Sequence, residues 1–280
     1  MTGSLARLVL GSADLRDDEV TPRLLERFRE SGGRALDLAN VYGDGESIAA
    51  IGRWLKKGGG ELMLYIKGCH PPFCSPTLVQ EEVDKARSAL GVETLPTFIL
   101  HRDDVNISVS AFAEALLNEV DCGRIQAFGV SNWTFERFRE LQAVLGADAS
   151  RLTAFSNQFS LAEMVTPTWP GCLSMTTEEL ASLRTDRITA LAWASLAEGY
   201  FAGRDRPSWI SDRNKDRRSR AEELAQERGT TPTAIALAYV LNESSQPLAL
   251  VGTRSQAHLD ELITATLIQL TPSDIARLET

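Results

Sequence analysis

The amino-acid sequence predicts an α/β protein with a single (β/α)8 TIM barrel. Short apolar stretches alternate with helical patterns from one end of the chain to the other. Each stretch is apolar at successive positions, which is typical of parallel strands that are buried on both faces. Eight such strands separated by helices favour a closed barrel over an open sheet. The candidate strands are residues 5–10, 34–39, 62–67, 97–101, 124–130, 153–158, 188–193 and 248–252.

The helical segments between these strands carry start and stop signals. A Thr-Pro pair opens the segment 21–33 and a Gly pair closes it, while a Ser-Pro pair opens 75–91 and a glycine ends it. The segment 108–123 has the apolar spacing of a helix that packs against a sheet. The apolar segment 232–242 follows another threonine and begins with proline, so we expect a well-buried helix there.

The whole chain, residues 1–280, is expected to form one domain. A barrel of this kind uses about 250 residues, and no stretch rich in Gly, Pro or Ser divides the sequence. The 43% hydrophobic and 24% charged residues are typical of a globular protein that buries a sizeable core.

The net charge of −9 limits the kinds of partner to expect. An acidic surface repels nucleic acid and anionic membranes, so we expect a small molecule as the main partner. No apolar run approaches the length of about 18 residues that a membrane span needs, and the first residues do not resemble a signal peptide. We therefore expect a cytoplasmic protein, and the sequence leaves its oligomeric state open.

The four cysteines do not predict a disulfide or a metal site, because they lack paired CxxC spacing. Cys69 and Cys74 flank His70 in the stretch CHPPFC. A four-ligand metal site would need a second such cluster, which the sequence does not offer. No metal is expected.

Polar and aromatic side chains follow several predicted strands at their carboxyl ends. Asp37 lies in an otherwise apolar strand, and Tyr42 lies in the turn just after it. Lys67 and His101 end two later strands. In a barrel the carboxyl ends of all strands converge on one mouth, where active sites are built.

Together these four residues suit the delivery of a proton to an oxygen atom. A phenol has a pKa of about 10 and is a weak acid at neutral pH. An ammonium group at Lys67 would lower the pKa of Tyr42, and Asp37 would keep Lys67 charged. His101 would donate a hydrogen bond to a carbonyl oxygen and polarise it. Taken singly, Asp37 could instead cap a helix, Lys67 could be an ordinary strand-end lysine, and His101 could be a core histidine.

Motifs in a fixed order cover almost the whole chain. They are LDLANVYGDGESIAAIG (36–52), YIKG (65–68), LHRDD (100–104), GRIQAFGVSNW (123–133), SNQFSL (156–161), LAWASLAEGYFAG (191–203), RGTTPTAIALAYVL (228–241) and VGTRSQAHLDEL (251–262). With them the chain resembles the aldo-keto reductase family, in its bacterial-type branch. The resemblance implies a barrel that binds a nicotinamide dinucleotide without the GxGxxG motif, which this sequence lacks after its strands. The positions that match the family's catalytic tetrad are Asp37, Tyr42, Lys67 and His101, with Tyr42 as the general acid.

The resemblance also implies a set of cofactor-binding residues. They are Gly11, Ser12, Ser131, Asn132, Gln158, Trp193, Leu196, Gly252, Thr253, Arg254 and Gln256. Trp193 would stack on the nicotinamide, and Arg254 would pair with a 2′-phosphate, so NADPH is expected rather than NADH. As alternatives, Trp193 could be a core residue, and Arg254 could be a solvated cation at a helix start.

Two long connections, 159–175 and 197–215, follow strands and are expected to form the walls of the substrate pocket. Trp133 is a candidate residue of that pocket. The tryptophans that could either line the pocket or serve as packing are Trp133, Trp169 and Trp209. The stretch 204–220 carries seven Lys or Arg and three Asp. It is either a solvated face or a loop whose arginine holds the cofactor pyrophosphate.

The resemblance departs from the family at the amino end. The family's barrel starts with a β-hairpin, for which this chain has no room because its first predicted strand begins near residue 5. We therefore expect a barrel without that hairpin.

The expected function is that of an NADPH-dependent carbonyl reductase. An aldehyde or ketone would be reduced to an alcohol by hydride transfer from the nicotinamide, with Tyr42 as the proton donor. One alternative is a nicotinamide-binding redox sensor or regulatory subunit with little turnover. Another is a barrel lyase or isomerase that uses Asp37 and His101 without net redox change.

Overall fold

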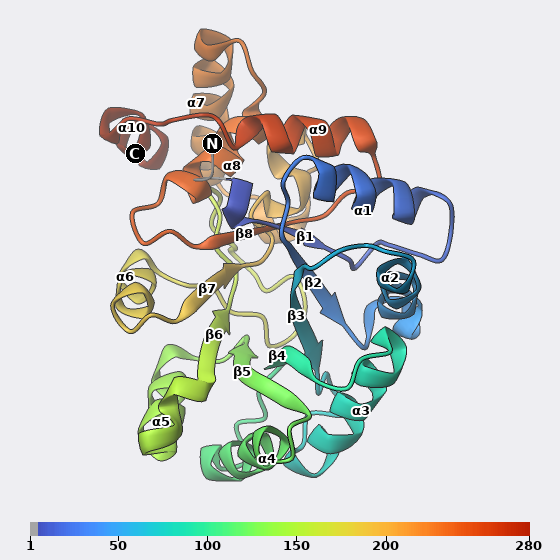
Figure 1. Cartoon of the computed structure of the whole chain (residues 1–280). Coiled ribbons are helices and arrows are strands. Elements are labelled where there is room, and N and C mark those ends of the chain that lie inside the picture. Colours follow the sequence, from blue (N-terminus) through green and yellow to red (C-terminus); the bar gives the residue numbers. More distant parts are fainter. Residues whose placement is uncertain (1–4) are drawn as a thin grey trace.

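Within residues 5–280, the part of the chain described by this computed structural model, eight parallel strands close into one barrel. Each strand pairs with the next, and β8 pairs with β1 to complete the ring. The strands are β1 (Leu8–Gly11), β2 (Ala35–Ala39), β3 (Met63–Gly68), β4 (Leu95–Leu100), β5 (Ile125–Ser131), β6 (Leu152–Ser156), β7 (Thr189–Ala192) and β8 (Leu248–Val251). Figure 1 shows the strands at the centre with the helices arranged around them. The predicted (β/α)8 barrel is confirmed.

The amino end of the barrel starts with a short helical turn. Leu5–Arg7 form a 3-10 turn, η1, that leads directly into β1, so β1 begins at Leu8 rather than at residue 5. No strand precedes β1 within residues 5–280. Residues 1–4 lie outside the described part of the chain.

Helices cover the outside of the barrel. They are α1 (Val20–Glu30), α2 (Glu46–Lys56), α3 (Val79–Leu90), α4 (Val109–Asp121), α5 (Phe135–Leu145), α6 (Thr177–Thr185), α7 (Asp212–Arg228), α8 (Pro232–Asn242), α9 (Gln256–Ala265) and α10 (Pro272–Glu279). The four helices predicted from start and stop signals all form, as α1, α3, α4 and α8. Ser108 caps α4, and Thr231 caps α8 just before its initial proline. None of the helices in residues 5–280 is long and apolar enough to cross a membrane.

The core has two layers, one inside the barrel and one between the strands and the helices. Val9, Tyr65 and Ile99 belong to the inner layer, whereas Phe98 and Leu100 belong to the outer one. Side chains alternate between the two faces of a strand, so the position two residues beyond an inner residue also points inward. This alternation places polar residues at the carboxyl ends of the strands into the mouth of the barrel.

The predicted connection after the seventh strand is partly wrong, because α7 begins at Asp212 inside the segment 197–215. Ser211 caps the helix by accepting a hydrogen bond from Asn214 N. Much of the basic stretch 204–220 is therefore helical. Arg213 and Arg217 form ion pairs with Glu163 at 2.7 and 3.4 Å, which fasten α7 to the connection after β6. The arginines of the stretch from Arg213 onward are therefore held in a helix, whereas Arg204 and Arg206 precede it.

Candidate active site

Three strand ends and one turn supply the predicted catalytic residues. Asp37 is the next inward position after Ala35 on β2, Lys67 follows Tyr65 on β3 in the same way, and His101 stands just past the end of β4. All three side chains are buried. The hydrogen bonds, ion pair and ring contacts given below join them with Tyr42 into one cluster.

Asp37 is the centre of this cluster. One carboxylate oxygen, Oδ1, lies 2.5 Å from Nζ of Lys67, and both side chains are almost fully buried. The other oxygen, Oδ2, accepts a hydrogen bond of 3.3 Å from the Tyr42 hydroxyl. Burial raises the pKa of Asp37, while Lys67 and the Tyr42 hydrogen bond oppose that rise. Asp37 thus connects the lysine to the tyrosine.

The pKa of Tyr42 differs from the expectation. Burial raises it well above its ordinary value, and the negative charge of Asp37 raises it further. The direction of this pKa is therefore opposite to the expected lowering. The reason is geometric, since the phenol donates to the carboxylate, which stabilises the neutral phenol.

A tight turn holds Tyr42 in place. Tyr42–Gly45 form the 3-10 turn η2 between β2 and α2, and Gly43 and Asp44 adopt left-handed backbone angles with φ of 57° and 52°. The Tyr42 ring meets the His101 ring edge-on, with 5.8 Å between their centroids. The phenol and the imidazole therefore face one small region of the mouth.

His101 is a buried, neutral imidazole. Burial lowers its pKa well below the ordinary value, and the positive charges of Lys67 and Arg102 and the nearby His70 add to the effect. Its Nδ1 atom is buried and has no hydrogen-bond partner within residues 5–280. A neutral imidazole carries one N–H donor, which suits a carbonyl oxygen as acceptor.

Two further residues at this mouth were missed in the sequence. The ring of His70 lies 5.0 Å from the ring of His101, and the guanidinium of Arg102 donates to the backbone oxygen of His101 at 2.9 Å. A signal was present in the sequence, because each residue lies two positions beyond the end of a strand. Sequence reasoning considered His70 as a metal ligand and did not assign Arg102 any role.

Asn132 and Gln158, two of the residues that the resemblance implies for the cofactor, already have protein partners. Nδ2 of Asn132 donates to the backbone oxygen of His101 and to Oγ of Ser131, and its Oδ1 accepts from the backbone of the 159–175 connection. Gln158 donates to one serine and accepts from another. An amide offers two N–H donors and two oxygen lone pairs, so Asn132 retains one lone pair for a ligand, and Gln158 retains one N–H donor and one lone pair.

Groups at the ends of β1, β7 and β8 fit a cofactor. The ring of Trp193 packs on the inner core layer, and its Nε1 is buried without a hydrogen-bond partner in the described part of the chain. The same holds for Oγ of Ser12. Gly11 is the register partner of Asp37. A Cβ atom at Gly252 would meet nothing within 4 Å, so the backbone there is open to a ligand.

The residues expected at the adenosine end lie around the start of α9. Arg254 pairs with Asp18 at 2.5 Å and donates to the backbone oxygen of Asp14 at 3.0 Å. Thr253 is buried, and Gln256 is the first residue of α9. Leu196 is instead buried in the outer core, where it precedes the 3-10 turn η5 (Ala197–Ala202).

Trp133 does not line the mouth, which corrects the prediction that it belongs to the substrate pocket. Its side chain is fully buried, its ring meets Phe112 edge-on at 5.6 Å, and Arg137 lies over it at 5.0 Å. Trp209 is also fully buried, whereas Trp169 is 53% exposed. Trp133 is therefore a packing residue with no surface to offer a substrate.

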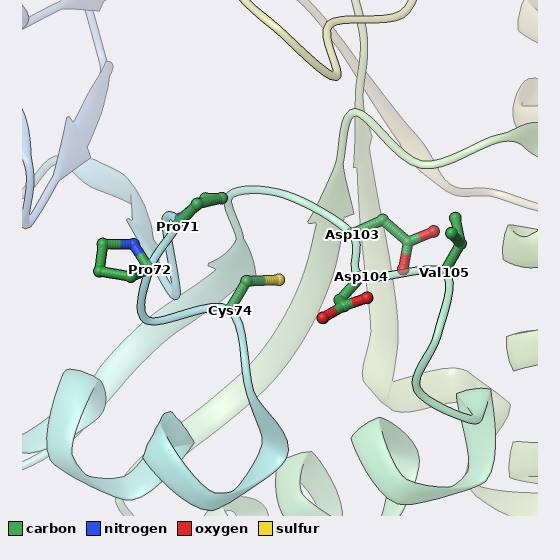
Figure 2. Close-up of a pocket in the computed structure, with 6 residues that line it drawn as sticks. All are labelled: Pro71, Pro72, Cys74, Asp103, Asp104 and Val105. Atoms are coloured by element: carbon green, nitrogen blue, oxygen red, sulfur yellow. The ribbon is translucent and has the colours of Figure 1, made fainter.

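A pocket of about 330 Å³ is lined by residues that follow His70 and His101 in the sequence. Its lining comes from the connection after β3 and the connection after β4, as Figure 2 shows. The residues are Pro71, Pro72, Cys74, Asp103, Asp104 and Val105. Sγ of Cys74 donates to the backbone oxygen of Arg102 at 3.2 Å and so joins the two connections. Burial raises the pKa of the Cys74 thiol to about 12, which keeps it protonated and unreactive.

Comparisons with known proteins agree with this geometry. A family model described as "Aldo/keto reductase family" matches residues 7–280. The chain is 23% identical over 287 residues to aldo-keto reductase str7 of Strobilurus tenacellus, a match that covers 94% of this chain and 81% of that protein. It is 22% identical over 288 residues to aldo-keto reductase yakc (NADP(+)) of Schizosaccharomyces pombe, which covers 92% of this chain and 81% of that one.

A solved structure shares the fold. It is an aldo/keto reductase from Klebsiella pneumoniae in complex with NADP and acetate, with a TM-score of 0.77 and 21% identity. The match covers 98% of this chain and 90% of the other.

Proposed function

The chain belongs to the aldo/keto reductase family of oxidoreductases, and we propose that it reduces an aldehyde or ketone to an alcohol with NADPH. The observation that carries the proposal is the contact of Asp37 with both Lys67 and Tyr42, next to the buried neutral imidazole of His101. This set offers a proton donor and a hydrogen-bond donor to one carbonyl oxygen.

The cofactor would be held by the ends of the strands around the mouth. Ser131, Asn132 and Gln158 would bind the carboxamide, and Trp193 would stack on the ring. When bound, NADPH supplies the hydride. The preference for NADPH is supported by Arg254, and by the two relatives whose names include NADP.

His101 would orient the substrate. Its single N–H donor would point the carbonyl oxygen toward Tyr42, since the two rings already lie within 5.8 Å of each other. Burial keeps this imidazole uncharged, so it donates a hydrogen bond without competing for the proton.

Tyr42 would deliver the proton. Its hydroxyl is held by Asp37 at 3.3 Å, which is long for a hydrogen bond between oxygens. A carbonyl oxygen that gains negative charge during reduction is a better acceptor and would redirect the hydroxyl away from the carboxylate. The charge left on the phenol would then lie near the ammonium group of Lys67, which is 2.5 Å from the same carboxylate.

The test follows the absorbance of NADPH with aromatic, aliphatic and sugar aldehydes and with ketones. We expect Tyr42→Phe to lower kcat on the order of 100- to 10,000-fold, which is the usual contribution of general acid catalysis. NADPH binding, measured by fluorescence, should persist. Tyr65→Phe is the matched control, because Tyr65 lies in the inner core layer below the mouth.

Full activity of Tyr42→Phe would contradict the assigned proton donor. Binding of NADPH without consumption by any variant would instead support the alternative function, a nicotinamide-binding sensor with little turnover. NADH serves as the second cofactor in each assay.

A further inference from the structure

Arg102 carries a buried positive charge beside the catalytic histidine. The residue is 7% exposed. One guanidinium nitrogen, NH1, donates to the backbone oxygen of His101 at 2.9 Å, and the other, NH2, contacts Sγ of Cys172 at 3.4 Å. No carboxylate of residues 5–280 forms an ion pair with it within 4.0 Å. A buried charge without a counter-ion is costly, so such a group calls for a partner.

The acidic neighbours of Arg102 are engaged elsewhere. Asp103 binds Arg137 through both carboxylate oxygens, at 2.6 and 3.0 Å. Oδ1 of Asp104 accepts from the backbone and the side chain of Asn106, each at 3.0 Å. The chain therefore pairs the nearby Arg137 fully and leaves the guanidinium of Arg102 without an anion.

The unpaired charge lies beside the groups proposed to meet the carbonyl. NH1 of Arg102 contacts the backbone oxygen of His101, and the ring of His101 meets the ring of Tyr42 edge-on. The same charge contributes to the lowered pKa of His101. The 159–175 connection covers it from the other side through Gly171 and Cys172. An anionic group attached near a bound carbonyl would thus come within reach of Arg102.

We infer that Arg102 binds a carboxylate or phosphate group of the substrate, so that the preferred substrates are oxo-acids or phosphorylated carbonyl compounds. This inference rests on the proposed carbonyl reduction. A guanidinium matches either anion with two parallel hydrogen bonds. The Cys172 sulfur is a weak acceptor that an anionic oxygen readily replaces.

The pocket lined by Cys74, which donates to the backbone oxygen of Arg102, suits the remainder of such a substrate. Asp103 and Asp104 lie on one side of it and the two prolines on the other (Figure 2). Asp103 is paired with Arg137, but the carboxylate of Asp104 forms no ion pair within residues 5–280 and repels an anion. The anionic group is therefore directed to Arg102, and the uncharged end of the molecule to the pocket.

The experiment compares charged substrates with neutral ones of similar shape. The pairs are 4-carboxybenzaldehyde with 4-methylbenzaldehyde, and glyceraldehyde 3-phosphate with glyceraldehyde. We expect the wild-type protein to prefer at least one anionic member, and the pair that responds identifies the anion. Arg102→Met should lower kcat/KM for that compound on the order of 10- to 100-fold, the usual effect of a hydrogen bond to a charged group. The loss for its neutral partner should be smaller, so that the ratio of the two kcat/KM values falls.

Two further variants keep the test specific. Arg206→Met removes the same charge from an exposed side chain that pairs with Glu198 at 3.3 Å, and it should leave the ratio unchanged. Arg102→Lys retains the charge but loses the planar fork, so it should show a smaller loss of the same kind. If Arg102→Met does not fold, the inference requires that Arg102→Lys by itself lowers kcat/KM for the anionic substrate more than for the neutral one. Binding of benzoate and inorganic phosphate to the NADPH complex, by calorimetry, gives a readout that needs no turnover.

An equal loss for charged and neutral aldehydes would overturn the inference, because Arg102 would then only support the 159–175 connection. So would a wild-type protein that reduces neutral aldehydes but neither prefers the anionic ones nor binds benzoate or phosphate. Reduction of no aldehyde at all, with anion binding that still depends on Arg102, would refute the proposed reaction and leave the anion site standing.

Discussion

Asp37 contacts Tyr42 through one carboxylate oxygen while the other holds the ammonium group of Lys67. The two distances, 3.3 Å to the Tyr42 hydroxyl and 2.5 Å to Nζ of Lys67, place the carboxylate between the phenol and the ammonium group. Because of this order, the tyrosine experiences the anion more directly than the cation. Its pKa is raised rather than lowered.

Replacing Asp37 by Asn should reverse this effect. Asp37→Asn removes the negative charge that raises the pKa of Tyr42 and leaves Lys67 in the site. We expect the pKa of Tyr42 to fall, and the alkaline limb of the pH profile of kcat/KM to move to lower pH. Ultraviolet difference titration of the tyrosines and the pH profile measure the two effects. Asp44→Asn, on the exposed part of the same turn, is the control. An unmoved alkaline limb would show that Asp37 does not set this pKa.

Removing the cation should cost stability as well as activity. Lys67→Met leaves the buried Asp37 without a counter-ion, and breaking a buried pair on one side costs about 3–5 kcal/mol of unfolding free energy. Lys215→Met breaks an exposed pair with Asp212 and should cost less than about 1 kcal/mol. Urea denaturation of both variants measures the difference. Equal costs would mean that the buried pair gives no special stabilisation.

The histidine in the mouth should make the fold sensitive to acid. The pKa of His101 is depressed in the folded chain, so the unfolded chain binds the proton first as the pH falls. The stability that depends on the neutral imidazole is complete above the unfolded pKa of about 6.5 and is lost below it. His101→Asn should therefore lose less stability than the wild type between neutral pH and pH 5, measured by urea denaturation. His258→Asn, at a half-buried position on α9, is the control. The proposal of a buried neutral imidazole is wrong if the His101 variant shows the same acid sensitivity as the wild type.

Asp18 should weaken the preference for NADPH. It occupies Arg254, the residue proposed to pair with a 2′-phosphate, and this partner lowers the pKa of Asp18 to about 2. Asp18→Asn frees the guanidinium, so NADPH should bind up to about fivefold more tightly. NADH binding should remain as it is. Asp17→Asn is matched to it, because Asp17 pairs with Arg53 at 2.8 Å instead. Fluorescence titration measures the affinity of each variant for NADPH and for NADH. Tighter binding of NADH as well would rule out an effect through the 2′-phosphate.

The barrel could be predicted because strands leave a simple pattern. Ile99 and His101 both point inward, two positions apart, and an apolar run that ends in such a polar residue is readable without a structure. The same rule located Asp37 and Lys67. The positions at which strands end were predicted less accurately. Gln158 was assigned to a strand, but β6 ends at Ser156 and Gln158 keeps an isolated bridge to Trp193.

The features that could not be predicted from the sequence depend on contacts between segments that are distant in the chain. Trp133 follows a strand end like the site residues, yet Asn132 before it has a φ of 58°, and the tryptophan is buried. Arg102 is adjacent to His101 in sequence, but its lack of an anion is a property of the fold. In the basic stretch, Ser211 begins a helix that the sequence did not predict. The ion pair of Arg213 with Glu163, which fastens this helix, joins two segments that are far apart in the sequence.

The barrel closes where β1 pairs with β8, and these two strands lie far apart in the sequence. On the ribosome, β1 therefore emerges long before its partner, and it waits on the order of tens of seconds with one edge unpaired. Exposed strand edges invite association with other chains. The residues proposed to hold the adenosine end follow β8 directly. A nascent chain released early would thus have the tetrad side chains but neither a closed barrel nor a complete cofactor site.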